Sequence, residues 1–590
     1  MTSASVSRIA LLAGSLLAAL PAPAQQVVPA DLIITGATVW TGDSARPSAQ
    51  AVAVIGEKIL AVGSRDEIMR HRGPQTRVIT APAGAFISPG FIDNHTHFQS
   101  AGALLVGVNL LDVATEDGLV RRMREARDRL PQGAWLVGGD WGAYEAWAQG
   151  STGAGGAGQS ARPAFSPHRR MIDSITPNTP ALLSKWDRSA HLANGRALQL
   201  AGVTCDWQGV ECENGVPTGR LTSAAAARVR RAIPPKSLEQ RLTESRAALA
   251  HLRALGLTTI HDNTGPEQME VYQELYRRGE LTTRVYMRPT MDKCPQLRAV
   301  GIRPGLGNDW IKIGGLKGFM DGIMGNSSAY FYEPYLTSGE RGQWRTMVTE
   351  PPGMEPLLFC ADSAGYWPMV HAIGDQAIDT LITMMEKVMR TNGPKERRWR
   401  VIHTQVIRNA EVAQRMARLG LIAEVQPYHA IDDMRWMEER IGQRGRWAYA
   451  FRTLQQAGVR LSFGSDWPGT NAAWYTADPL LGMYAAVTRQ TLGGEPEGGW
   501  YPQERVDAET ALRAYTVNNA WAAGEENSKG KLAPGFLADL VVIDGNPLTV
   551  PPARLRDLKV LYTVTGGKVV YDASKDPPAA DPARAQIPGR

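Results

Sequence analysis

The chain has 590 residues, of which 43% are hydrophobic and 21% are charged, and its formal net charge at pH 7 is +6. A chain of this length exceeds one ordinary hydrophobic core, so we expect a large barrel-type domain with one or two further modules. The basic residues are scattered and the net charge is small for the length, which argues against a nucleic-acid-binding surface. After the N-terminus, no apolar run is long enough to span a membrane.

The N-terminus predicts a secretory signal peptide over residues 1–24. Arg8 precedes an apolar run over residues 9–20, and Ala22-Pro23-Ala24 offers a small-x-small cleavage site before Gln25. A buried first helix is the competing interpretation. Removal of the signal would leave a periplasmic or secreted protein.

After export, the four cysteines are expected to lie in an oxidising compartment. Cys205 and Cys212 flank a short polar loop and can form a disulfide or remain two free thiols, because sequence does not determine connectivity. Cys294 and Cys360 lack the CxxC spacing of a zinc clip or a redox site.

The two ends of the chain share a pattern that is typical of strands. Residues 31–86 alternate apolar and polar side chains, and the segments "FLADLVVIDG" and "LKVLYTVTGGKVVYDA" repeat this pattern near the C-terminus. We therefore predict one small β-sandwich built from residues 25–86 and 526–575, followed by a tail over 576–590.

The middle of the chain, residues 87–525, contains eight short β-rich runs, most of them followed by a helical stretch. In order they are "GFIDNHTH", "LTTIHDN", "TRVYMRP", "IKIGGLKGFMDG", "PMVHAIGD", "WRVIHTQV", "LIAEVQPY" and "LSFGSDWP". Eight βα units predict an α/β fold, a (β/α)8 TIM barrel whose chemistry lies at the C-terminal ends of the strands.

One connection in this series is much too long for a single βα loop. About 160 residues separate the first run from the second, which predicts an inserted subdomain at about 100–235. Within it, the Gly-, Ala- and Ser-rich stretch 150–163 predicts a loop, either a lid or a tolerated surface insertion.

Metal-binding residue types stand at the ends of several predicted strands. His95 and His97, at positions i and i+2, face the same side of the first strand and can bind one cation. A lone histidine in an apolar strand is more often a hydrogen-bonded core residue. Here, however, further candidates follow at later strand ends, and together they predict a metal site: Lys317, His371, His403 and Asp466.

Two of these residues raise specific chemical questions. A protonated Lys317 beside a cation is electrostatically unfavourable, and carboxylation by CO2 would instead give a carbamate able to bridge two metals. The alternative is an ion pair between Lys317 and Asp321. Asp466 can serve as a metal ligand, as a proton shuttle, or as both.

The motifs together resemble those of the amidohydrolase superfamily, specifically its YtcJ-like branch, which includes N-substituted formamide deformylases. "GFIDNHTH", "LKGFMDG", "HAIGD", "VIHTQ" and "GSDWP" stand in the order of that family, and "GNSSAYFYEPY" and "KLAPGFLADLVVID" add to the likeness. The sequence departs from the branch at "WDRSAHLAN", where Asp187 matches but Arg188 and Ser189 replace Gly-His.

The resemblance implies a metal-dependent barrel with a composite β-sandwich that hydrolyses C–N bonds other than peptide bonds. Carried over by motif, the metal ligands are His95, His97, Lys317, His371, His403 and Asp466. The main hypothesis is hydrolysis of an amide or N-formyl bond by metal-activated hydroxide. Asp466 would move the proton, and His403 would help stabilise the oxyanion if it is not fully engaged as a ligand.

The sequence leaves open the identity of the metal, the role of Asp93 and the kind of bond that is hydrolysed. Zinc, as one ion or two, is expected, although manganese, cobalt and iron suit such ligands equally. Asp93 is either an orienting residue or a strand cap. An ester, lactone or cyclic amide could replace the amide substrate, and a non-catalytic metal- or small-molecule-binding protein is the remaining alternative. The expected partner is a small-molecule substrate, and a homo-oligomer is compatible with the sequence.

Substrate contacts are predicted at the ends of other strands and in the insertion. A structural hydrogen-bonding role competes with this assignment for the residues of the second strand, and bulk packing competes with it for the tryptophans, including Trp141. The candidates are His261, Asp262, Gln426, His429, Trp467 and Asp187.

Overall fold

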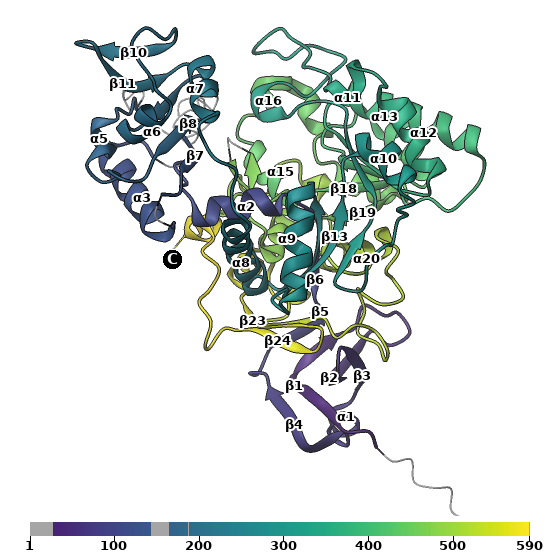
Figure 1. Cartoon of the computed structure of the whole chain (residues 1–590). Coiled ribbons are helices and arrows are strands. Elements are labelled where there is room, and N and C mark those ends of the chain that lie inside the picture. Colours follow the sequence, from purple (N-terminus) through teal and green to yellow (C-terminus); the bar gives the residue numbers. More distant parts are fainter. Residues whose placement is uncertain are drawn as a thin grey trace, which may run out of the picture.

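The computed structural model describes residues 27–111, 113–131, 133–142, 165–186, 188–470 and 473–588. It has a mixed α/β fold in which a sheet built from both chain ends, a central body and a separate lobe can be distinguished (Figure 1). The predicted signal peptide, the stretch 150–163 and Asp187 lie outside the described residues. In the part of the chain that the structure describes, no helix is long and apolar enough to cross a membrane.

Strands from both ends of the chain share one eight-stranded sheet. Its order is β24-β23-β22-β5-β1-β2-β3, with β4 paired to β1. The antiparallel pair β5–β22, in register from Leu540↔Pro89 to Ile543↔Phe86, joins the N-terminal strands to the C-terminal ones. The strands are β1 (Ala30–Trp40), β2 (Ser48–Ile55), β3 (Lys58–Gly63), β4 (Arg72–Thr80), β5 (Phe86–Pro89), β22 (Leu540–Ile543), β23 (Val560–Thr565) and β24 (Lys568–Asp572). Helix α1 (Arg65–Met69) lies between β3 and β4.

The central body contains two parallel sheets, with the orders β14-β13-β12-β6 and β15-β16-β17-β18-β19. Nearly all their side chains are buried, as expected for parallel strands covered on both faces. Single bridges join the two sheets at Thr96↔Trp467 and Thr290↔Lys317. The strands are β6 (Phe91–Thr96), β12 (Leu257–Asn263), β13 (Arg284–Arg288), β14 (Ile311–Ile313), β15 (Leu316–Phe319), β16 (Pro368–Ala372), β17 (Arg400–His403), β18 (Ile422–Val425) and β19 (Arg460–Phe463).

All eight predicted β-rich runs contain a strand, but the fourth run forms two, β14 and β15. The break falls at Gly314 and Gly315, where a side chain would have no room. A Cβ atom on Gly314 would lie 2.0 Å from the ring of Tyr286, and one on Gly315 would lie 2.4 Å from the carbonyl oxygen of Trp367. The close approach of neighbouring chains therefore requires glycine and interrupts the ladder.

Helices that follow the strands surround both parallel sheets (Figure 1). In α13, buried residues recur at three- and four-residue spacing from Ala377 to Val388, which gives the helix one apolar face toward the core. The principal helices are α2 (Phe98–Val106), α8 (Leu238–Ala254), α9 (Pro266–Arg277), α10 (Cys294–Ala299), α11 (Thr346–Thr349), α12 (Met354–Ser363), α13 (Asp375–Asn392), α14 (Ala410–Arg418), α15 (Pro427–Asp433), α16 (Met437–Ile441), α17 (Phe451–Gln456), α18 (Pro479–Thr488), α19 (Ala508–Ala514) and α20 (Val517–Ala522).

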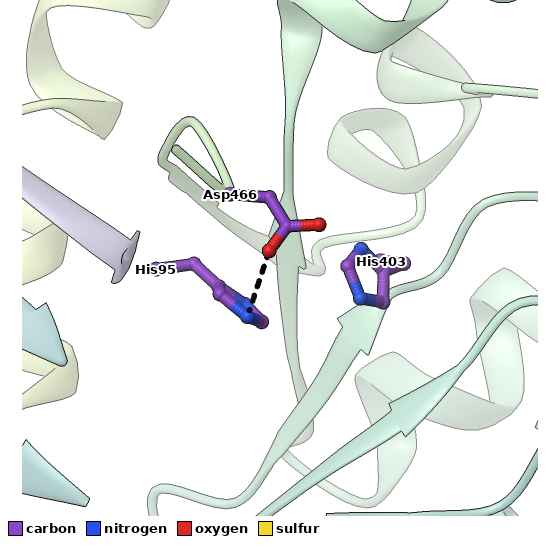
Figure 2. A group of neighbouring side chains, drawn as sticks. All are labelled: His95, His403 and Asp466. Carbon is purple, nitrogen blue, oxygen red and sulfur yellow. Dashed lines mark ion pairs between the residues drawn. The ribbon is translucent and has the colours of Figure 1, made fainter. Parts of the chain in front are cut away.

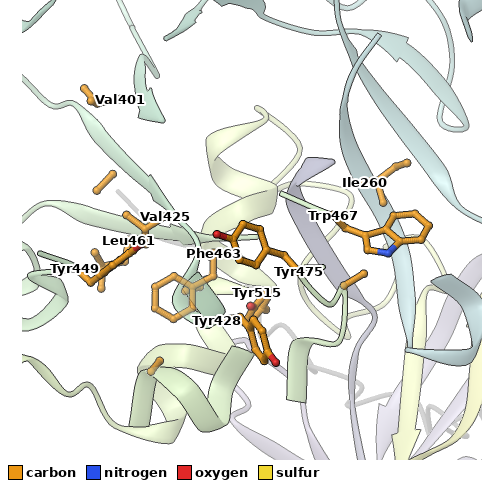
Figure 3. Packing of buried hydrophobic residues seen from close by; sticks show 14 of the residues in the cluster. Ile260, Val401, Val425, Tyr428, Tyr449, Leu461, Phe463, Trp467, Tyr475 and Tyr515 are labelled. Atoms are coloured by element: carbon orange, nitrogen blue, oxygen red, sulfur yellow. The ribbon is translucent and has the colours of Figure 1, made fainter. Parts of the chain in front are cut away.

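The core of the central body brings together residues from distant strands. Figure 3 shows Leu461 and Phe463 of β19 beside Val425 of β18, with Tyr515 nearby. The rings of Phe463 and Tyr515 pack edge to face with centroids 5.5 Å apart. This packing holds β19 in place, and β19 leads directly to Asp466.

The long insertion folds as a lobe with its own sheet and its own apolar clusters (Figure 1). Trp141, which ends β7, is 3% exposed and belongs to one of these clusters, so its bulk serves the core of the lobe. The sheet order is β10-β11-β9-β8-β7. Its elements are α3 (Glu116–Arg129), β7 (Leu136–Trp141), α5 (Arg170–Asp173), β8 (Ala181–Lys185), β9 (His191–Ala193), α6 (Gly195–Leu200), β10 (Val210–Glu213), β11 (Val216–Leu221) and α7 (Ser223–Arg230).

All four cysteines are paired. Cys205 and Cys212 form a disulfide within the lobe, one of the two states that the sequence left open. Cys294 and Cys360 form a second disulfide, which joins α10 to α12 across 66 positions of sequence. Such a long-range pair has no signature in the spacing of the cysteines.

We expect His251 of α8 to make folding stability depend on pH in the acidic range. His251 is 4% exposed, stacks on Trp467 with ring centroids 5.0 Å apart, and has no partner for Nε2. Burial lowers its pKa to about 4, below its ordinary value of 6.5, so the unfolded chain binds the proton more readily between these pH values. His251 should therefore cost stability as the pH falls from about 6.5 to about 4, by up to about 3 kcal/mol.

The measurement is urea unfolding of wild type and of His251→Phe, which keeps the stacked ring, at pH 7 and pH 4.5. The loss of unfolding free energy between the two pH values should be smaller in His251→Phe. A variant at the partly exposed His71, His71→Phe, serves as control. An equal loss in wild type and His251→Phe would contradict the prediction.

Candidate metal centre

The two histidines of the first parallel strand meet the aspartate that follows the last one. His95 lies in β6 and is 1% exposed, whereas the His97 side chain, at the start of α2, is 38% exposed. The Nε2 atoms of His95 and His97 lie 3.3 and 3.1 Å from Oδ1 of Asp466. Figure 2 shows this oxygen directed at His95 while the other carboxylate oxygen points away from it. The backbone N–H of Asp466 donates to the carbonyl oxygen of His95 at 2.8 Å and fixes this junction.

His403, at the end of β17, completes a compact group of donor atoms. His95, His403 and Asp466 each offer a ligand atom, and these atoms all lie within 4.8 Å of one another. Nδ1 of His403 lies 2.8 Å from Oε1 of Gln426, an acceptor, so Nδ1 carries the proton and Nε2 has a lone pair. His403 and Asp466 both have positive φ, 70° and 58°, a strained conformation that is typical of functional sites.

The chemistry of these groups fits a divalent cation. Nδ1 of His95 donates to Oε1 of Glu424 at 3.0 Å, which leaves a lone pair on Nε2. Burial lowers the pKa of His95 well below its ordinary value, so its imidazole is neutral. The Nε2 lone pair therefore faces the carboxylate of Asp466 at 3.3 Å, and a cation placed between these two acceptors would bind both. Imidazole and carboxylate are ligands that zinc and similar metals accept.

Lys317 of β15 reaches the same point from the second parallel sheet. It is 1% exposed, and its Nζ lies 3.4 Å from Nε2 of His95. Burial, assisted by the charge of Arg288, lowers the pKa of Lys317 to about 7. The alternative partner, Asp321, is engaged elsewhere, because its carboxylate accepts hydrogen bonds from the backbone N–H groups of Tyr330, Ile373 and Gly374. An ion pair with Asp321 therefore does not explain how Lys317 is accommodated in a buried position.

His371 of β16 lies beside the group but is oriented differently. Its ring centroid is 4.5 Å from that of His403. Its Nε2 lies 2.9 Å from the carbonyl oxygen of Gly322 and 3.4 Å from Oδ1 of Asp321. Because the carbonyl oxygen is an acceptor, Nε2 carries the proton, and Nδ1 is the nitrogen of His371 that remains for a metal.

Two of the predicted substrate contacts, Gln426 and His429, lie next to these histidines. Gln426 holds His403 as described above. The ring of His429 stacks on Tyr475, with centroids 3.7 Å apart, and its Nε2 lies 3.0 Å from the carbonyl oxygen of Ser465, the residue before Asp466. Both residues follow β18, where a side chain can reach a bound substrate.

Three other predicted contacts are engaged in the packing of the fold. His261 faces Arg400, with Nδ1 and Nη1 2.9 Å apart. Trp467 is fully buried and stacks on His251, pointing into the apolar core (Figure 3).

The carboxylate of Asp262 accepts from the backbone N–H of Phe98 at 2.8 Å and from the hydroxyl groups of Thr96, Thr264 and Tyr272. Asp262 thereby anchors the start of α2, immediately after His97.

A buried ionic network beneath the histidines was not predicted from the sequence. Glu424 of β18 is fully buried and accepts from His95, from Arg288 at 2.8 Å and from Arg400 at 2.9 Å. Burial opposes ionisation of Glu424, but Arg288, His95 and Arg400 outweigh it and hold the pKa of Glu424 well below its usual range. The available signal was a charged residue inside each of three apolar strands, a costly arrangement unless the charges are paired.

Asp93, the remaining candidate, supports the backbone of the site. Its Oδ1 accepts from the N–H groups of His95 at 2.9 Å and Ser465 at 3.0 Å. It thus ties β6 to the segment that carries Asp466. Burial raises the pKa of Asp93 to about 7.

A family model described as the amidohydrolase family matches residues 82–571. The chain belongs to the amidohydrolase family. This confirms the resemblance noted in the motifs, and the match includes every residue of the metal centre.

Individual relatives cover nearly the whole of this amidohydrolase. It is 30% identical to Protein LONG AFTER FAR-RED 3 of Arabidopsis thaliana, over 92% of both chains. It is 30% identical to the putative amidohydrolase YtcJ of Bacillus subtilis, over 89% of this chain and 96% of that one. It is 27% identical to the N-substituted formamide deformylase of Arthrobacter pascens, over 92% of this chain and 98% of that one.

Among solved structures, an uncharacterized metal-dependent hydrolase from Pyrococcus furiosus resembles this amidohydrolase with a TM-score of 0.69. The sequences are 23% identical, and the match covers 88% of this chain and 100% of that chain. This likeness shows a shared fold.

Proposed function

We propose that this amidohydrolase uses a divalent metal to hydrolyse a C–N bond, of the amide or N-formyl type, in a small molecule. The observation that carries the proposal is the convergence of ligand atoms from His95, His403 and Asp466 within 4.8 Å of one another, because buried imidazole and carboxylate groups in such a cluster suit a divalent cation. The likeness to N-substituted formamide deformylase over 92% of the chain supports the bond type. The proposed ligands are His95, His97, Lys317, His371, His403 and Asp466.

The proposed architecture is a (β/α)8 barrel over residues 87–525 with a β domain formed by 25–86 and 526–575, whose strands share one sheet where a two-sheet sandwich was expected. The bridges Thr96↔Trp467 and Thr290↔Lys317 support joining the two parallel sheets into one barrel. In such a barrel the C-terminal strand ends face one common site, and the proposed ligands all lie at or near these ends.

A bound divalent metal, which we propose to be zinc as one ion or two, would polarise the substrate carbonyl and lower the pKa of a water molecule. Oδ1 of Asp466 faces the two histidines, so Oδ2 is the oxygen that takes the proton from the attacking water. The same carboxyl would then protonate the leaving nitrogen. Burial lowers the pKa of His403, so its neutral Nε2 lacks a proton to donate to an oxyanion and suits the ligand role.

We further propose that Lys317 carries a carbamate in the active protein. The neutral amine would attack CO2, forming an N–C bond and releasing one proton, and the product would be an anion suited to a metal. The engagement of Asp321 by three backbone amides supports this proposal, because Asp321 is then not available to hold Lys317 as a protonated ion-pair partner.

We also propose that the protein is exported after cleavage near Ala24 and Gln25. Two disulfides, Cys205–Cys212 and Cys294–Cys360, support an oxidising compartment.

The proposed function is tested with a panel of N-formyl amides, N-acetyl amides, esters and lactones. Protein stripped by a chelator should lose hydrolysis of amides, and Zn²⁺ should restore it. Preference for an ester or lactone over every amide would contradict the proposed bond type. Undiminished hydrolysis in the stripped protein, with metal absent by elemental analysis, would contradict metal dependence.

A further inference from the structure

Asn263, the last residue of β12, lies between the two histidines of the first strand. Its Nδ2 is 3.0 Å from Nε2 of His95 and 3.2 Å from Nε2 of His97. None of the proposed ligands comes from β12, and the resemblance to known families assigned no role to this residue.

The amide nitrogen of Asn263 contacts both imidazole Nε2 atoms, as a cation shared by the two histidines would. Because Nδ1 of His95 donates to Glu424, Nε2 of His95 is an acceptor, and one N–H of Asn263 satisfies it. The other end of the same amide, Oδ1, is buried and has no hydrogen-bond partner. A buried carbonyl oxygen without a partner is costly, and such cases call for an explanation.

A cation held by both imidazoles would reverse the preferred orientation of this amide. The N–H groups, which carry partial positive charge, would be repelled. Rotation of the amide by 180° about the Cβ–Cγ bond exchanges Nδ2 and Oδ1 with almost no change of shape. The same rotation places the unsatisfied oxygen where the N–H groups had been. Asparagine carbonyl oxygens are established ligands of divalent cations.

We propose that Oδ1 of Asn263 is an additional ligand of the metal held by His95 and His97. The inference rests on the proposed function, since it needs a metal at these histidines. Asn263 would add an oxygen without adding negative charge, and it would contribute a ligand from the second strand. Loss of the metal would let the amide turn back and satisfy the imidazoles.

The test compares Co²⁺ binding by apo wild type, Asn263→Leu and Asn263→Asp. Leucine keeps the approximate volume but has no lone pair, whereas aspartate keeps an oxygen and adds charge. Affinity is measured by competition with a chelator, and coordination is followed by visible absorption of the bound Co²⁺. We expect Asn263→Leu to bind at least about tenfold more weakly with an altered spectrum, and Asn263→Asp to bind at least as tightly as wild type.

Thr264→Val is the matched control at the neighbouring position, where the hydroxyl donates to Asp262 and, among the described residues, has no hydrogen bond to a proposed ligand. It should bind Co²⁺ like wild type. If Asn263→Leu does not fold, as judged by thermal unfolding, Asn263→Ala replaces it with the same expectation.

The two proposals fail in different ways. If wild type and His95→Ala bind Co²⁺ equally, no metal is held at this site and the proposed function falls. In a second outcome, wild type binds Co²⁺ and His95→Ala does not, so a metal is held at this site. If Asn263→Leu then matches wild type in Co²⁺ affinity and in spectrum, Asn263 is not a ligand and this proposal is wrong.

Discussion

Replacing Asp466 by asparagine should lower kcat for amide hydrolysis about a hundred- to ten-thousand-fold, the usual contribution of a positioned general acid–base group. The side chain keeps its size, and its carbonyl oxygen can still face His95 and His97. It can no longer take a proton from water and return it to the leaving nitrogen. The bound metal should therefore remain while turnover is lost.

Metal content and kcat are measured on the same Asp466→Asn preparation at saturating metal. Asp362→Asn is a suitable control, because Asp362 is also buried and ion-paired, with Arg397 and Lys395, and none of these three residues is a proposed ligand. It should keep wild-type kcat. A metal-loaded Asp466→Asn protein that hydrolyses amides at the wild-type rate would show that the proton moves by another route.

Replacing Glu424 by glutamine should lower both stability and metal affinity. Arg288 and Arg400 are fully buried and share Glu424 as their counter-charge. Removing the charge from a buried network of this kind costs about 3–5 kcal/mol. The amide would also be a poorer acceptor for Nδ1–H of His95, and loss of such a partner typically weakens metal binding about 10–100-fold.

Stability is measured by urea unfolding of the apo protein, and affinity by Co²⁺ competition under conditions where the variant is folded. Glu525→Gln provides the comparison, since Glu525 is buried and paired with Lys312 and Lys529 but makes no contact with His95. It should lose stability and keep its metal affinity. Wild-type affinity in folded Glu424→Gln would limit Glu424 to a role in packing.

The strands of the central body could be predicted because each is a short, continuous apolar run with a change of composition at its end. The residues at these ends, such as His95 and His403, were recognised because imidazoles at the ends of apolar strands are unusual and chemically informative. Their order along the chain also sufficed to recognise the family. These are local properties, and neighbouring residues determine them.

Partnerships between strands could not be predicted in the same way. His95 and Glu424 are 329 positions apart, and further contacts of the histidine pair come from Asn263 of β12, Lys317 of β15 and Asp466 after β19. Asn263 resembles an ordinary polar residue after a strand until the fold places it against two imidazoles. Cys294 and Cys360 likewise meet only because α10 and α12 pack together.

The sequence by itself determined the family, the strand-end residues and the kind of chemistry that imidazole and carboxylate groups support. Only the tertiary structure decided which nitrogen of His95, His403 and His371 faces the metal centre, since this depends on Glu424, Gln426 and the carbonyl oxygen of Gly322. It also decided that Asp262 and Trp467 serve the packing. The physical reason is that a side chain's protonation, orientation and burial are set by contacts across strands, which amino-acid order does not specify.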